Sequence, residues 1–199
     1  MKKILAFCLI IQSIALFGQE EINAKHKAKI GAGISYFPVT EVMRYLGRDE
    51  GVPEIEGKAF YSAGITGVFA LKKNLSIESG AYFSHYRVRV DLRELSQPNF
   101  YEDIPMLYVP ISLRFNFNKY VYLSTGLLFG FDFSNPGELK NQTGIGMMLS
   151  PGVSFDCSDR ISLFLNPYLN LPSMVSFNYG LNNDRILEAS IRVGFLYQL

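Results

Sequence analysis

Apolar and polar residues alternate between Leu107 and Phe133, in two runs joined by the turn Asn118-Lys119. A period of two is that of a β-strand, because successive side chains point to opposite faces. Each run spans at least 11 residues, which satisfies the roughly 9 to 11 that a tilted strand needs to cross a bilayer. The pattern therefore predicts a hairpin with one lipid-facing side. That side carries Leu107, Val109, Ile111, Leu113, Phe115 and Phe117, then Val121, Leu123, Thr125, Leu127, Phe129, Phe131 and Phe133.

Six further segments repeat the alternation, so we predict eight strands. They are residues 27–36, 59–70, 75–92, 144–155, 161 to about 179, and 187–199. The segment 75–92 changes phase near His85, because Tyr86 and Val88 place apolar side chains on the face that was polar before. We interpret this change either as a β-bulge near the membrane rim or as a strand that leaves the bilayer.

The connections between the strands alternate in length. Short turns are predicted at 72–74, 118–119 and 157–159, and longer connections at 38–57, 93–102, 134–142 and 180–185. Short turns at one rim, long loops at the other and an even number of strands are typical of outer-membrane barrels. We therefore expect an outer-membrane location in a diderm bacterium, with the long loops extracellular and both termini periplasmic.

The positions of the glycines indicate which face of the strands points into the barrel. Ten of the 17 glycines lie on the polar face, where a narrow barrel is crowded, whereas a solvated outer face has no need of a residue that weakens strands. This excludes a soluble barrel with an apolar interior. The predicted fold is all-β, an eight-stranded antiparallel up-and-down transmembrane β-barrel with a filled polar interior. The ten glycines are Gly31, Gly33, Gly64, Gly80, Gly126, Gly130, Gly144, Gly146, Gly152 and Gly194.

The first 18 residues have the pattern of a secretory signal peptide, with Lys2 and Lys3 before the apolar stretch Ile4–Phe17 and a small residue at Gly18. Cleavage is expected after Gly18 or, alternatively, after Ala15. We assign residues 1–18 to the signal peptide, 19–26 to a short periplasmic segment and 27–199 to the barrel.

Export changes the composition only slightly. Without Lys2 and Lys3 the 19 basic residues become 17, against 18 acidic ones. Such a balance does not favour nucleic acid as a partner. Cys157 is then the remaining cysteine, so no internal disulfide is expected.

Charged residues on the polar face are expected to fill the lumen. Eight strands enclose room for side chains and little else, and buried charges need partners. We therefore predict an interior network of paired charges and hydrogen bonds, and a small-solute pore is the alternative. The predicted members are Lys29, Glu78, Arg114, Asp132, Glu188 and Arg192.

An outer-membrane enzyme that modifies lipids is a second alternative. His26 and His85 are the only histidines, and His85 lies beside Ser84 with Glu94 or Glu102 in the adjoining loop as an orienting acid. Adjacent residues on a strand face opposite sides, so Ser84 and His85 meet only if a bulge turns one of them. We therefore assign no catalytic residue. One cysteine and two distant histidines form no recognisable ligand set, so no metal or cofactor site is expected.

The long loops are the expected working surface. Thr40 resembles a helix N-cap and Gly47 a helix C′ residue, which suggests a short helix in the first loop. This loop could cover the barrel mouth or bind an envelope protein, or it could be merely solvated.

The last strand has a polar residue at Arg192, glycine at Gly194, an aromatic residue at Tyr197 and a hydrophobic residue at Leu199. This spacing resembles the C-terminal signal read by the barrel-assembly machinery, although the signal usually ends in an aromatic residue. Its candidate residues here are Gly194, Tyr197 and Leu199, and the alternative is an ordinary closing strand.

The whole mature chain, from residue 19 onward, resembles the PorT-like outer-membrane β-barrel family. The resemblance rests on Gly80–Ser84, on Leu107–Phe115 with its Tyr-aliphatic-Pro-aliphatic pattern, and on the partner motif Tyr122–Gly126. It implies a compact eight-stranded barrel, and some family members are linked to protein secretion and gliding machinery.

The prediction for function is a non-enzymatic outer-membrane protein with a structural or protein-interaction role in the envelope, accessory to a secretion or surface complex. Its expected partners are outer-membrane lipid, the barrel-assembly machinery and an envelope protein bound through the long loops.

Overall fold

The structure is a computed structural model that describes residues 28–36, 39–43, 54–91, 99–134, 142–177 and 185–199. The predicted signal peptide 1–18 and segment 19–26 lie outside the described residues. The described part consists of β-strands, turns and bends. It contains no helix long and apolar enough to span a membrane.

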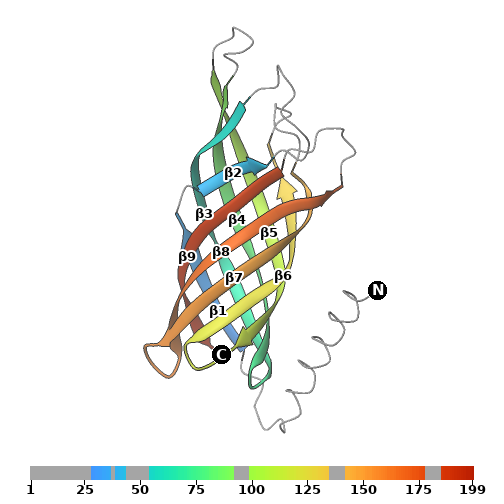
Figure 1. Ribbon diagram of the computed structural model, residues 1–199. Coiled ribbons are helices and arrows are strands. Elements are labelled where there is room, and N and C mark those ends of the chain that lie inside the picture. The colour runs from blue at the N-terminus through green and yellow to red at the C-terminus, as the bar shows by residue number, and fades with distance from the viewer. Residues whose placement is uncertain (1–27, 37–38, 44–53, 92–98, 135–141, 178–184) are drawn as a thin grey trace, which may run out of the picture.

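The strands form a single closed ring (Figure 1). All pairings between neighbours are antiparallel, and β1 closes the ring by pairing with both β3 and β9. β2 continues the path of β1 and pairs with the first residues of β9, so β1 and β2 share one position in a ring of eight strands. This confirms the predicted fold class. The strands are β1 (Ala28–Ser35), β2 (Val39–Met43), β3 (Glu54–Lys72), β4 (Leu75–Asp91), β5 (Phe100–Asn116), β6 (Val121–Asp132), β7 (Gly144–Asp156), β8 (Ile161–Ser176) and β9 (Arg185–Gln198).

The alternating pattern of the sequence decides which side chains face outward. On β5, Ile111 is 51% exposed while its neighbour Ser112 is 3% exposed. On β6, Leu127 is 48% exposed and Leu128 is 2% exposed. The exposed faces of all the long strands are rich in Leu, Ile, Val and Phe, which gives the barrel an apolar belt.

Side chains at the short turns fix the hairpins. The Asn118 Oδ1 atom accepts hydrogen bonds from the backbone N–H groups of Tyr120 and Val121, each at 2.8 Å. In the β7–β8 turn, Ser158 Oγ accepts from the N–H of Ile161 at 3.1 Å. Asn and Ser are favoured in turns for this reason. The three short turns and the C-terminus lie at one end of the barrel (Figure 1), which we call the short-turn end, and the other is the long-loop end.

The phase change in β4 is not a bulge at His85. β4 and β5 keep one register from Leu75 to Val90, and the nearby irregularity lies on β3 between Gly57 and Ala59. Tyr86 and Val88 therefore point into the barrel, where both are fully buried. The bulge interpretation is wrong, and the alternative of a strand that continues beyond the apolar belt fits the register.

Two of the predicted long connections contain strand. β5 begins at Phe100, inside the expected loop 93–102, and β2 and the start of β3 occupy part of the expected loop 38–57. The helix N-cap at Thr40 is wrong, because Thr40 pairs with Glu188 in the β2–β9 ladder. β1 pairs only with the second half of β9. Without β2, the first half of β9 would have unpaired backbone N–H and C=O groups on the edge that faces β1, and β2 pairs with these groups. Gly47 lies outside the described residues.

Glycine at the inward position Gly126 is required by close contact between neighbouring strands. A Cβ atom there would lie 2.2 Å from the Ile111 carbonyl oxygen and 2.5 Å from the Ser112 Cα. At Gly67, whose Cα partner in β4 is Ser79, the nearest atom would be the Phe69 ring at 3.2 Å. A side-chain ring can rotate away from an added Cβ atom, whereas backbone atoms that are hydrogen-bonded in a β-ladder cannot easily move.

We predict that Gly126→Ala lowers the free energy of unfolding by about 1–3 kcal/mol, the usual cost of overpacking. Gly67→Ala is the matched control and should change it by less. Urea unfolding in lipid vesicles, followed by the difference in gel mobility between folded and heated protein, measures both. Equal stability of the two variants would contradict this account of the lumen.

Candidate functional site

The lumen is closed near the long-loop end by a cluster of buried apolar and aromatic side chains, which we call the long-loop cluster. Its residues come from β3, β4, β5, β6 and β9, so it joins more than half of the ring. A second and smaller group, Val68, Phe164 and Leu196, is buried toward the short-turn end. The long-loop cluster consists of Phe60, Tyr82, Tyr86, Val88, Ile104, Met106, Tyr108, Leu128 and Ile186.

Tyrosines of the long-loop cluster connect it to a buried carboxyl group. The Tyr86 hydroxyl donates a hydrogen bond to Glu188 Oε2 and lies 2.8 Å from the Tyr108 hydroxyl. The Tyr86 ring also packs on Phe60, with 5.0 Å between ring centroids. These contacts cross the lumen from β4 to β9, so the barrel is bridged by side chains as well as by its wall.

Arg192 on β9 lies between two tyrosine rings. Its guanidinium carbon is 3.8 Å from the centre of the Tyr82 ring and 4.5 Å from that of Tyr168. Such cation–π contacts are stronger when the cation is removed from water, and Arg192 is only 5% exposed. Arg192 therefore contacts β4 across the lumen and also the neighbouring strand β8.

A direct ion pair joins Glu78 of β4 to Arg114 of β5. The Arg114 Nη1 and Glu78 Oε2 atoms are 3.6 Å apart, and each side chain is 8% exposed. Ser124 Oγ donates to the same carboxylate oxygen at 3.0 Å. The Arg114 guanidinium also lies 3.4 Å above the centre of the Tyr122 ring.

The remaining predicted interior residues lie nearer the ends of the lumen. Lys29 Nζ donates to Ser162 Oγ at 2.9 Å and lies 3.7 Å from Asp156 Oδ1 at the short-turn end. At the long-loop end, the two carboxylate oxygens of Asp132 accept hydrogen bonds from the backbone N–H groups of Ser134 and Gln142, at 2.8 and 2.7 Å. The structure therefore brings Glu78 and Arg114 together, while the other four residues contact different groups.

Sequence reasoning missed two parts of this arrangement. Asp156, which contacts Lys29, was not included in the predicted network. The tyrosines at 82, 86, 108, 122 and 168 were also left out of the predicted network, although tyrosines of this group contact most of the buried charges. The available signal was their inward position in the alternating pattern.

His85 lies on the outside of the barrel and contacts an acid that the sequence analysis did not select. Its Nε2 atom is 3.3 Å from Asp103 Oδ1, and its ring stacks on Tyr61 with 5.1 Å between centroids. Asp103 is available because β5 starts at Phe100 and pairs Asp103 with Arg87. Glu102, the expected orienting acid, is the adjacent residue on β5, and Glu94 lies outside the described residues.

Ser84 cannot serve His85 as a nucleophile in this arrangement. It is 1% exposed and donates to Ser62 Oγ at 2.9 Å inside the barrel, whereas His85 faces outward. Among the described residues, no group of three His, Cys, Asp or Glu side chains could hold a metal ion. The buried polar and charged side chains of the described chain, such as Glu78, Glu188 and Arg192, instead lie in the lumen.

We predict that Arg114→Met lowers the free energy of unfolding by about 3–5 kcal/mol, because it leaves the buried Glu78 carboxylate without its ion pair. Lys119→Met in the exposed β5–β6 turn is the control and should stay within about 0.5 kcal/mol of the wild type. Adding Glu78→Gln to Arg114→Met should recover part of the loss. Urea unfolding in vesicles measures these changes, and an additive double variant would show that the pair does not matter.

No family model and no curated protein matches this chain. Solved structures do match, and all of those described here are outer-membrane barrels. OprG from Pseudomonas aeruginosa has a TM-score of 0.61 and 14% identity, over 88% of this chain and 96% of that one. AlkL, determined in lipid bilayers, has a TM-score of 0.52 and 8% identity, over 90% of this chain and 91% of that one.

Neisserial surface protein A has a TM-score of 0.50 and 17% identity, over 84% of this chain and 95% of that one. Likeness at such low identity shows the fold alone, and the resemblance to the PorT-like family is supported by no family match. This chain has the fold of a small outer-membrane β-barrel, with eight antiparallel strands in a ring.

Proposed function

We propose that this protein is a non-enzymatic outer-membrane barrel with a structural or protein-interaction role in the envelope. The observation that carries the proposal is the closed lumen. The long-loop cluster and the contacts of Glu78, Arg114, Glu188 and Arg192 fill the space that a solute would need. We therefore infer that the protein acts through its outer surface and its long loops, and that it does not transport solutes through the ring.

The interaction surface that we propose is the part of β3, β4 and β5 beyond the apolar belt. These are the longest strands of the described chain, at 19, 17 and 17 residues, and the ends of β4 and β5 stand above the rest of the wall in Figure 1. Here Arg87 lies 3.8 Å from Asp103 and 5.1 Å from the centre of the Tyr101 ring. Exposed Arg and Tyr side chains on rigid strands are typical of protein interfaces.

The PorT-like resemblance makes the proposal more specific. It suggests that the barrel is accessory to a secretion or surface complex. The alternation of short turns and long loops favours a long-loop end that is extracellular and a short-turn end that is periplasmic. Gly194, Tyr197 and Leu199 would then serve the barrel-assembly machinery. Gly194 and Tyr197 lie on the closing strand β9 and Leu199 directly follows it, which is compatible with that role. The envelope partner is proposed to bind the long loops and the β3–β5 extension.

The two alternatives have less support. A pore requires the long-loop cluster to move aside, although its aromatic side chains pack on one another inside the lumen. A lipid-modifying enzyme requires a nucleophile beside His85, and Ser84 lies on the other side of the barrel wall. The His85–Asp103 contact is instead part of the charged surface of the β3–β5 extension.

We expect purified protein in a planar lipid bilayer to show no steady conductance steps, because the lumen is filled. A large porin inserted into the same membrane is the positive control. Discrete, reproducible steps from the folded barrel would overturn the closed-lumen proposal and favour the small-solute pore.

We expect a photo-crosslinking residue at Tyr101 to capture one discrete envelope protein in cells of the source bacterium. The same residue at Phe69, which is 52% exposed in the apolar belt, should capture lipid instead. Arg87→Glu should abolish the Tyr101 product if the extension is the interface, because it reverses the charge beside Asp103. No product at Tyr101, or the same product from both positions, would contradict the proposal.

A further inference from the structure

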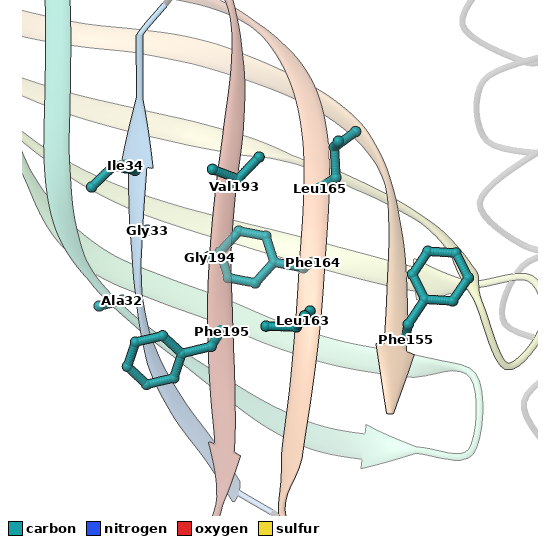
Figure 2. Close-up of a pocket in the computed structure, with 10 residues that line it drawn as sticks. All are labelled: Ala32, Gly33, Ile34, Phe155, Leu163, Phe164, Leu165, Val193, Gly194 and Phe195. Carbon is teal, nitrogen blue, oxygen red and sulfur yellow. The ribbon is translucent and has the colours of Figure 1, made fainter. Parts of the chain in front are cut away.

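The outer surface of the barrel is hollowed where β8, β9 and β1 meet. The hollow has a volume of about 650 Å³ and lies among outward-facing apolar side chains (Figure 2). Its volume is within the range of roughly 300–1,000 Å³ found for small-molecule sites. The residues that define it are Ala32, Ile34, Phe155, Leu163, Leu165 and Phe195.

Small residues create this hollow. Ala32 lies next to Phe195 in the β1–β9 ladder, and Gly33 lies directly opposite Gly194, so this part of the wall is thin. The ring of Phe164 closes the wall from the lumen side, because Gly194 leaves room for it: a Cβ atom on Gly194 would lie 2.6 Å from Phe164 Cζ. The hollow is therefore open toward lipid and closed toward the lumen.

A cation lies just beyond the hollow at the short-turn end. In the β8–β9 ladder, Ile161 pairs with Tyr197 and Leu163 pairs with Phe195. Tyr197 is therefore the next outward-facing residue on β9 after Phe195, which lines the hollow, and Arg160 precedes its partner Ile161 on β8. The Arg160 Nη1 atom donates to the Tyr197 hydroxyl at 3.3 Å. Within the part of the chain that the structure describes, Arg160 forms no ion pair, and the residue is exposed.

The same rim carries further exposed cations. Lys72 and Lys73 lie at the β3–β4 turn and Lys119 at the β5–β6 turn. Asp156, an acid near this rim, contacts Lys29 on the lumen side. Each Lys or Arg near a membrane surface favours anionic lipid, so this end of the barrel is suited to anionic headgroups.

We propose that the hollow binds an acyl chain of one anionic glycerophospholipid, whose phosphate is held by Arg160 and the Tyr197 hydroxyl. Leu165 is four residues beyond Ile161 on β8, which is roughly 13 Å along a strand. A lipid with its phosphate at Arg160 can therefore place its chain across the whole hollow. The apolar lining and the cation at one end together select an amphiphile with an anionic head.

The absence of tryptophan from the sequence allows a clean test. Phe195→Trp places a reporter in the hollow, where Phe195 is 47% exposed. Phe117→Trp places the control directly after the end of β5, across the barrel, where Phe117 is 67% exposed. Both proteins are reconstituted in phosphatidylcholine vesicles that contain increasing fractions of phosphatidylglycerol with brominated acyl chains. Folding is checked by gel mobility before and after heating.

We expect the reporter at 195 to reach half-maximal quenching at a phosphatidylglycerol fraction about fivefold lower than the reporter at 117. The reason is that the hollow holds the lipid in contact with Arg160, and one such cation favours anionic lipid by about this factor. Arg160→Gln should remove this difference, and Arg160→Lys should retain most of it. Ala32→Leu should also remove it, because the added side chain fills the hollow. Lys119→Gln beside the control reporter should shift that curve less than Arg160→Gln shifts the curve at 195, because Lys119 does not lie at the end of the hollow.

Two results would overturn the proposal. Identical curves at positions 195 and 117, or a difference that Arg160→Gln leaves unchanged, would show that the hollow and Arg160 form no lipid site. Protection of the 195 reporter from quenching, together with a crosslinked dimer, would show that a second copy of the chain covers the hollow.

Discussion

The narrowness of an eight-stranded ring is the constraint on which the rest of the structure depends. Its lumen has room for side chains and little water, so every inward residue must fit, and every inward polar group must find a partner. The chain meets the first requirement with glycine where strands approach closely, as at Gly126. It meets part of the second by placing tyrosine rings and hydroxyls around the buried charges, as at Arg192 and Glu188. In the described chain, the Arg192 Nε atom and several inward Ser and Asn oxygens have no hydrogen-bond partner.

The same constraint explains why tyrosine is so useful in the lumen. A tyrosine fills volume like phenylalanine, yet it offers a ring face to a cation and a hydroxyl to a carboxyl group. Tyr86 uses the hydroxyl for Glu188, and Tyr122 offers its ring face to Arg114. An interior of charges alone would need an exact partner for each group, because an unpaired buried charge costs several kcal/mol.

Much of the barrel follows from the sequence because strand periodicity and turn chemistry are local. The alternation on β5 and β6 predicted the exposed and buried faces correctly, and the short turn at Asn118 was visible from its residues. What the sequence could not show is where the bilayer pattern ends. The apolar side chains of Tyr86 and Val88 suggested that the strand had exchanged its inward and outward faces. Beyond the apolar belt, however, apolar residues pack inside the barrel rather than toward lipid.

Contacts between distant strands were the other part that local patterns could not predict. Thr40 is a residue type that is common at helix N-caps, but its backbone pairs with the edge of β9 and is therefore part of strand β2. The partner of His85 was sought in the following loop, whereas the register of β4 and β5 supplies Asp103. Both outcomes depend on how strands align around the ring, and one residue of slip would exchange the two faces.

A filled lumen also makes the barrel wall stiff, and this affects what the outer surface can do. Contacts such as Tyr86 with Glu188 and Arg192 with Tyr82 join opposite sides of the ring, so the wall cannot easily flatten. A stiff wall keeps surface features in place without ordering cost on binding. The charged extension of β3–β5 and the hollow beside Arg160 lie at opposite ends of the strands, so one rigid body can present a protein-binding surface at one membrane face while lipid fixes it at the other.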